Sequence, residues 1–162
     1  SLLEEDKIDL AKELLAKGDQ KIILPVDCMV SDTFDFAGRQ VGALKDVAAD
    51  GIPVNEFGLD IGPKSIETFR SIINVAKTIV WNGPMGVFEI DDTAKGTYAI
   101  ANALAEATAR GATTVIGGGD SASAIHKAGV ADNVYHVSTG GGASLELMEG
   151  KVLPGVAALS DK

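Results

Sequence analysis

The stretch that decides the fold is Thr113-Thr-Val-Ile-Gly-Gly-Gly-Asp-Ser121, in which an apolar, β-branched run passes through three glycines. A second stretch, Val134-Tyr-His-Val-Ser-Thr-Gly-Gly-Gly142, repeats that order. Strands that alternate with helices at this spacing are typical of a parallel sheet. The sequence therefore predicts two neighbouring strands, each followed by a glycine-rich turn and a helix, the first helix to about residue 128 and the second to residue 148.

The same alternation extends upstream of these two units. Thr78-Ile-Val-Trp81 predicts a strand, and Pro63 suits the first position of a helix that runs to about residue 75. Asp91 and Asp92 are predicted to cap an alanine-rich helix that ends at Gly111. From residue 58 onward we therefore expect an α/β domain with a largely parallel sheet.

The N-terminal third is less regular. Residues 2 to about 17 have the pattern of a surface helix that stops at Gly18, and residues 21–30 form an apolar run that predicts a buried strand. The span from 31 to 50 is polar and predicted to be irregular and partly extended. The sequence begins at Ser1 without an initiator Met or a signal-peptide pattern, so we expect it to start within a longer protein.

Composition limits the partners of this chain. Its 162 residues, 46% of them hydrophobic, suit a single domain over residues 1–162. The net charge of −9 disfavours nucleic acid and anionic membranes as partners. The single cysteine, Cys28, cannot form an intramolecular disulfide, which fits a reducing, cytoplasmic setting.

Both glycine triplets fall where open α/β sheets bind ligands, beyond the carboxyl ends of strands. Helix N-termini there leave N–H groups unpaired, and glycines let a phosphate approach the backbone. Gly117–Gly119 and Gly140–Gly142 are therefore candidate anion cradles, although such triplets also serve simply as tight turns. Asp120 follows the first triplet and is either a helix cap or a ligand of Mg²⁺, and Ser121 could offer a hydroxyl to the same phosphate group.

The loop Asn82-Gly-Pro-Met-Gly-Val-Phe-Glu89 leaves another strand end. Its asparagine and glutamate could bind polar ligand groups such as ribose hydroxyls, whereas spacing alone favours a solvent-facing Glu89 and a core-packed Phe88. Gly58-Leu-Asp-Ile-Gly-Pro63 is predicted as a further turn at a strand end, against which a flat base could lie.

Two general phosphate-binding motifs bear on this pattern. A Walker A sequence is absent, whereas Gly117-Gly-Gly-Asp-Ser-Ala122 satisfies the loose dinucleotide fingerprint G-x-G-x-x-A. The next predicted strand ends at Ser138 without the acidic residue that binds ribose in dinucleotide folds. A dinucleotide-binding oxidoreductase domain thus stays open as an alternative, as does a non-enzymatic interaction module.

Three long motifs, Trp81 to Glu89, Gly117 to Ala122 and His136 to Leu147, resemble phosphoglycerate kinases in order and spacing. The resemblance covers essentially the whole chain and implies part of a Rossmann-like, three-layer αβα nucleotide-binding domain. It also implies phosphoryl transfer between ATP/ADP and 3-phosphoglycerate/1,3-bisphosphoglycerate in glycolysis, with Mg²⁺.

By that resemblance, Gly58 and Leu59 would contact adenine, Glu89 would bind ribose, and Asp120 would hold Mg²⁺. The nucleoside would be bordered by Asn82, Gly83, Pro84 and Val87, and the phosphates by Gly117, Gly118, Gly119 and Ser121. Gly119, Gly141 and Gly142 would direct N–H groups at the transferring phosphoryl group. The family's substrate lobe and its lysine-bearing Gly-Gly-Ala-Lys segment have no counterpart in this sequence, so the chain alone is expected to be inactive. The parent protein is expected to be monomeric.

Overall fold

The computed structural model describes residues 3–159. In chain order its elements are η1 (Glu5–Lys7), α1 (Ile8–Gly18), η2 (Asp19–Lys21), β1 (Asp27–Ser31), β2 (Phe34–Asp35), β3 (Gln40–Val41), β4 (Lys45–Ala48), β5 (Phe57–Ile61), α2 (Pro63–Val75), β6 (Thr78–Trp81), η3 (Asp91–Thr93), α3 (Lys95–Ala109), β7 (Thr113–Gly117), α4 (Gly119–Lys127), η4 (Ala131–Asn133), β8 (His136–Ser138), α5 (Gly141–Met148) and α6 (Pro154–Ala157). These elements make up a mixed α/β fold.

A parallel sheet with the strand order β6-β7-β8 confirms the predicted α/β class. Val80 lies opposite Val115, and Ile116 lies opposite Val137. Because strands run parallel in this register, their carboxyl ends lie at one edge of the sheet. The loops that follow all three strands therefore begin close together.

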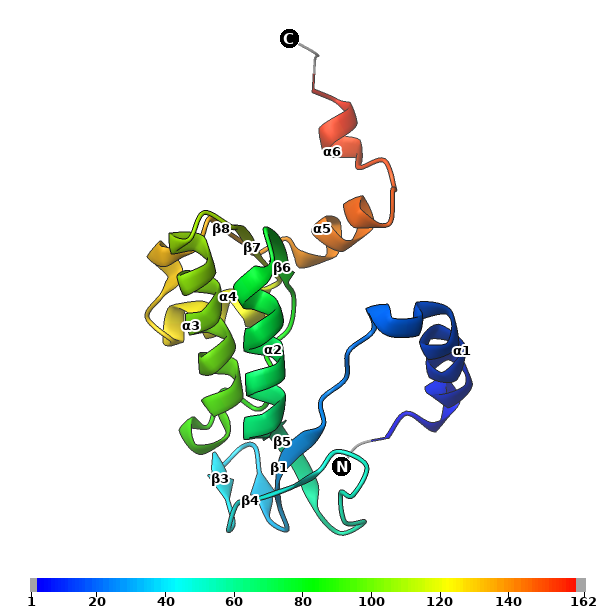
Figure 1. The fold of residues 1–162 in the computed structure, drawn as a ribbon, viewed down its shortest axis with the longest axis vertical. Coiled ribbons are helices and arrows are strands. Elements are labelled where there is room, and N and C mark those ends of the chain that lie inside the picture. Colours follow the sequence, from blue (N-terminus) through cyan, green and yellow to red (C-terminus); the bar gives the residue numbers. More distant parts are fainter. Residues whose placement is uncertain (1–2, 160–162) are drawn as a thin grey trace.

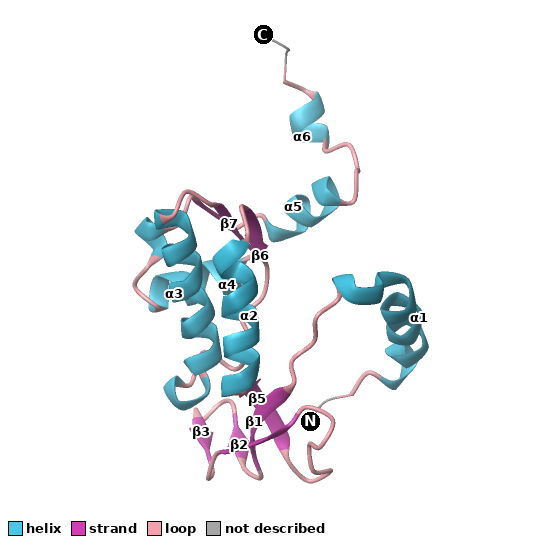
Figure 2. Cartoon of the chain, in the orientation of Figure 1, coloured by secondary structure: helices cyan, strands magenta, loops and turns pink. Residues whose placement is uncertain are grey.

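Helices α2, α3 and α4 form one layer beside this sheet (Figure 2). Helix α3 contacts α2, α4 and β7. The core between helices and strands is apolar and consists of Ile61, Trp81, Phe88, Ala94, Ile100, Ala101, Leu104, Ile116, Ala124 and Ile125.

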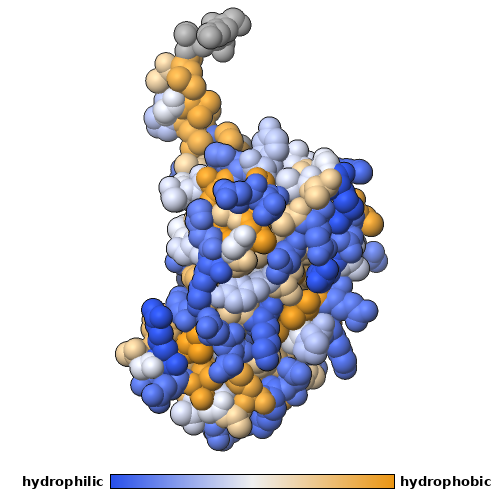
Figure 3. Space-filling model, turned by 90° about the vertical axis from the view of Figure 1, so that its left-hand side faces the viewer, coloured by the Kyte–Doolittle hydropathy of each residue, from blue (hydrophilic) through white to orange (hydrophobic). Residues whose placement is uncertain are grey.

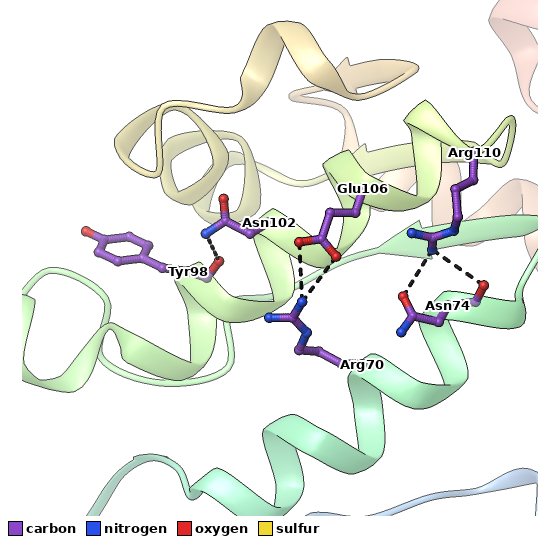
Figure 4. Close-up of polar contacts among 6 residues, drawn as sticks. All are labelled: Arg70, Asn74, Tyr98, Asn102, Glu106 and Arg110. Carbon is purple, nitrogen blue, oxygen red and sulfur yellow. Dashed lines mark hydrogen bonds and ion pairs between the residues drawn. The ribbon is translucent and has the colours of Figure 1, made fainter.

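Polar pairs also join α2 to α3 along their solvent side (Figure 4). Arg70 donates to both carboxylate oxygens of Glu106, at 3.3 and 3.1 Å. Arg110 donates to the side-chain oxygen of Asn74 at 3.1 Å. Exposed pairs of this kind typically contribute less than about 1 kcal/mol, so apolar packing remains the main link between the two helices.

Strand β5 belongs to a separate, antiparallel sheet with the order β4-β1-β5. The largely parallel sheet predicted from residue 58 onward therefore begins only at β6. The turn predicted over residues 58–63 is occupied by β5 as far as Ile61. The chain reverses direction between β1 and β5, which sets Cys28 opposite Ile61 in antiparallel register. A lone apolar run does not reveal which partner its backbone will pair with.

The predicted strand over residues 21–30 forms only from Asp27 onward. Ile22 and Leu24 are exposed, at 40% and 56%, and no ladder within residues 3–159 includes them. The helix predicted from residue 2 is confirmed as α1 over Ile8–Gly18, preceded by a 3-10 turn, although residue 2 itself lies outside the described residues. Its leucines are exposed, as expected for a surface helix.

The C-terminal segment around α6 extends away from the body (Figure 1). Figure 3 colours this projection largely hydrophobic, and Val152 is 80% exposed. Within residues 3–159, none of the helices combines the length and apolar character that crossing a membrane requires.

Buried carboxylates from the antiparallel sheet cap the two long helices. Asp27 accepts hydrogen bonds from the amides of Lys64 and Ser65, at 2.9 and 2.8 Å, and from the Ser65 hydroxyl at 2.6 Å. Burial raises the pKa of Asp27, but these hydrogen bonds outweigh it and leave the pKa below its usual value. The first turn of α2 is thus tied to β1.

Helix α3 is capped in the same way by Asp60, which accepts from the Gly96 amide at 2.7 Å. The prediction that Asp91 and Asp92 cap this helix was therefore wrong. Both residues lie in the separate turn η3, and neither makes a capping hydrogen bond. A carboxylate from a distant strand satisfies the helix terminus instead.

Replacing Asp27 with Ala should lower the free energy of unfolding by about 3 kcal/mol, because buried N–H donors lose their acceptor. Urea denaturation at pH 7 measures this change. The matched control, Asp50→Ala at an exposed turn, should change it by less than about 0.5 kcal/mol. Because the folded-state pKa is depressed, the Asp27 contribution is present above pH 4 and lost as pH falls through the folded pKa. Equal stability of the two variants at pH 7 would contradict the capping role.

Candidate nucleotide-binding site

The two glycine triplets meet beyond the ends of β7 and β8. A Cβ atom added to Gly141 would lie 2.6 Å from the Cα and amide nitrogen of Gly118 and 2.9 Å from Oδ1 of Asn82. A Cβ added to Gly118 would also lie 2.9 Å from that oxygen, and the φ of Gly118 is +94°. The starts of α4 and α5 therefore touch through bare backbone. Asn82, which directly follows β6, lies beside them.

Part of each triplet is already hydrogen-bonded within the protein. The Gly118 amide donates to the Ser138 carbonyl at 3.1 Å, and the Gly140 amide donates to the Ser138 hydroxyl at 3.1 Å. The backbone amides at the first positions of α4 and α5 come before the first intrahelical hydrogen bonds. In the described part of the chain they therefore lack a protein acceptor. The unpaired amides include those of Gly119, Asp120, Gly141 and Gly142.

Neighbouring elements hold the loop from Asn82 to Glu89 in place. The Gly83 amide donates to the Ser121 hydroxyl at 2.6 Å, and the Val87 amide donates to the Leu59 carbonyl at 2.8 Å. Ser121, expected beside the phosphates, is only 1% exposed, so its hydroxyl oxygen positions this loop. Pro84 is half-buried in the same loop.

Lys127 is a site residue that the sequence analysis missed. Its ammonium donates to the carbonyls of Phe88 and Glu89, at 2.9 and 3.3 Å, and pairs with Asp91 at 2.9 Å. The hydrogen bond to Asp91 raises the pKa of Lys127. Helical spacing could have revealed it, because residues seven apart share a face and Lys127 lies seven residues after Asp120.

Two cavities flank this loop. An apolar one of about 330 Å³ is lined by Gly58, Leu59 and Val87, together with Cys28 and Asp60. A polar one of about 400 Å³ is lined by Arg39, Phe88, Glu89, Asp120, Ser123 and Lys127. The residues expected at adenine thus share one cavity, and those expected at ribose and Mg²⁺ share the other.

Asp120 is exposed at the start of α4 and makes no capping hydrogen bond. Within residues 3–159 there is no group of three or more His, Cys, Asp or Glu that could hold a metal. Mg²⁺ commonly binds through one or two carboxylates and takes its other ligands from phosphates and water. A single aspartate beside unpaired amides fits that requirement.

Comparison with known proteins identifies the family. The phosphoglycerate kinase family model matches residues 1–151. The chain belongs to the phosphoglycerate kinase family. The phosphoglycerate kinase of Synechococcus elongatus is 56% identical over 164 residues, and the chloroplastic phosphoglycerate kinase of Volvox carteri is 57% identical over 166 residues. These matches cover 99% and 100% of this chain but 40% and 35% of the relatives.

Solved structures agree with this family assignment. Phosphoglycerate kinase from Coxiella burnetii superposes with a TM-score of 0.86 at 38% identity, covering 97% of this chain and 39% of that protein. The enzyme from Pyrococcus horikoshii OT3 gives 0.78 at 34% identity, covering 95% and 36%. The chain therefore spans well under half the length of these phosphoglycerate kinases.

Asp60 lines the apolar cavity and is 5% exposed. Burial raises its pKa to about 6, despite hydrogen bonds from the Gly96 and Ile61 amides and the charge of Lys95. A carboxyl whose folded-state pKa is raised favours the folded state most at low pH. That contribution is present below the unfolded pKa near 4 and is lost as pH rises through about 6.

The unfolding free energy of Asp60→Asn should therefore vary less between pH 4 and 7 than that of the unsubstituted chain. Relative to the variant, the unsubstituted chain should lose stability as pH rises through 6, since its carboxyl must ionise while buried. Chemical denaturation at each pH tests this, with Asp46→Asn at an exposed strand position as control. Parallel pH profiles for Asp60→Asn and the unsubstituted chain would refute the assignment.

Replacing Gly141 with Ala should destabilise the chain by about 1–3 kcal/mol, because the new methyl group collides with the Gly118 backbone. Thermal unfolding measures the loss. Gly142→Ala is the matched control in the same helix turn, since a Cβ there meets nothing within 4 Å and alanine favours helix. Equal effects of the two substitutions would show that the contact with Gly118 does not constrain the site.

Proposed function

We propose that this chain is the nucleotide-binding part of a kinase that transfers a phosphoryl group between ATP/ADP and 3-phosphoglycerate/1,3-bisphosphoglycerate. The observation that carries the proposal is the contact between the starts of α4 and α5, at Gly118 and Gly141. It sets two groups of unpaired amides side by side, with a carboxylate next to them. Membership in the phosphoglycerate kinase family supports the same reaction.

The nucleotide would extend across the two cavities. Adenine would lie in the apolar cavity against Gly58, Leu59 and Val87, and the ribose would bind Glu89 in the polar cavity. Asn82, Gly83 and Pro84 would border the nucleoside from the anchored loop. The phosphates would then reach Gly118 and Gly119 at the start of α4, next to the buried Gly117 and Ser121.

Phosphoryl transfer requires positioning and charge stabilisation more than covalent chemistry from the protein. The amides of Gly119, Gly141 and Gly142 would donate hydrogen bonds to the transferring phosphoryl group. Being fixed by two helix starts, they need no reorganisation during the reaction. Asp120 would hold Mg²⁺, which neutralises phosphate charge when bound.

The proposed partners are small molecules only: ATP or ADP here, and 3-phosphoglycerate through a further domain. The net charge of −9 argues against nucleic acid. We further propose a monomeric parent in the cytoplasm, consistent with the unpaired Cys28.

Replacing Asp120 with Asn in the full-length protein that carries this sequence should weaken MgADP binding about 10- to 100-fold, because the metal loses the carboxylate proposed to hold it. Calorimetric titration with ADP in Mg²⁺ and in EDTA separates the metal-dependent part, and binding in EDTA should be unchanged. Asp132→Asn, at an exposed turn outside both cavities, serves as control. An unchanged Mg²⁺ dependence would remove the metal assignment, and tighter binding of NADH than of MgADP would favour an oxidoreductase.

A further inference from the structure

The polar cavity has two cationic side chains, and only one of them is engaged. Lys127 donates to the Phe88 and Glu89 carbonyls and pairs with Asp91. Arg39 lines the same cavity, yet its guanidinium makes no hydrogen bond or ion pair with any residue of the described range 3–159. The Arg39 guanidinium therefore lines this cavity without an acceptor from residues 3–159.

The hairpin that carries Arg39 is well anchored. Its strands β2 and β3 pair Asp35 with Gln40, and the Asp35 carboxylate accepts from the Gly38 amide at 2.9 Å. The Phe34 ring packs 5.8 Å from that of Phe57 on β5. Arg39 is thus held beside the cavity by a structured turn.

The backbone at Arg39 would suit another residue better. Its φ is +51°, in the left-handed region where glycine and asparagine are favoured and a side chain is costly. Local conformation therefore does not account for an arginine here. Its position beside the cavity does, because a guanidinium is the group that best matches phosphate oxygens.

The chemistry of the cavity walls defines the ligand. Glu89 and Asp120 are carboxylates that accept from hydroxyls or bind a metal, whereas Arg39 can only donate. A ligand that contacts all three would offer hydroxyl groups or a bound metal to the carboxylates and anionic oxygens to the guanidinium. A nucleotide has both, with its first phosphate directly attached to the ribose.

We propose that Arg39 is a further nucleotide-binding residue, whose guanidinium donates to the phosphate nearest the ribose while Glu89 holds the ribose hydroxyls. This inference rests on the proposed function, since it presupposes the nucleotide orientation given above. Arg39 adds a cation to a site otherwise built from backbone amides and carboxylates.

Calorimetric titration of the full-length protein with MgADP and with adenosine tests the proposal. Arg39→Gln should weaken MgADP binding about tenfold, the effect of losing one hydrogen bond to a charged group, and leave adenosine affinity unchanged. Arg39→Lys, which keeps the charge, should recover part of the loss. Arg70→Gln is the control, because Arg70 pairs with Glu106 away from both cavities.

Each outcome decides the matter. Unchanged MgADP affinity in Arg39→Gln would overturn the proposal, and so would an equal loss for MgADP and adenosine, which would indicate a structural role of the hairpin. If the unsubstituted protein binds adenosine and MgADP but Arg39→Gln behaves normally, the proposed function stands and only the role of Arg39 falls. If the unsubstituted protein binds neither, both fall together.

Discussion

Contact between two stretches of bare backbone is the constraint on which the site depends. Gly118 and Gly141 approach so closely that a methyl group on either would strike its surroundings. This approach brings two helix N-termini together, where the first amides of α4 and α5 have no acceptor within residues 3–159. Parallel pairing of β7 with β8 sets the spacing, so the sheet and the candidate anion site are consequences of one register.

Buried carboxylates integrate the rest of the fold with that sheet. Asp27 on β1 and Asp60 on β5 cap α2 and α3, so the antiparallel sheet is joined to the helical layer through charge-assisted hydrogen bonds. Asp60 also lines the apolar cavity, next to the residues expected at adenine. The element that shapes this cavity is therefore the one that fixes the start of α3.

The candidate site could be predicted only in part. Its glycines, Asn82 and Asp120 follow strand ends, with Glu89 further along the loop after β6, and open α/β sheets bind ligands at strand ends, so residue type and position were enough to nominate them. Lys127 lies at the far end of α4 and could have been found only from helical spacing. Arg39 carries no comparable signal, because the two-residue strands of its hairpin are too short to leave a pattern in the sequence.

Local patterns in the sequence alone determined the limits of α2 and β6, the glycine turns after β7 and β8, and the parallel order of those strands. They depend on neighbouring residues, such as Pro63 at a helix start, and so need no distant partner. Only the tertiary structure decided that Ile22 to Leu24 stays unpaired, that β5 runs antiparallel, and that Asp60 rather than Asp91 caps α3. Strand pairing and capping by a distant side chain depend on which segments are in contact in the folded protein. Hydrophobic periodicity along the chain does not indicate those contacts.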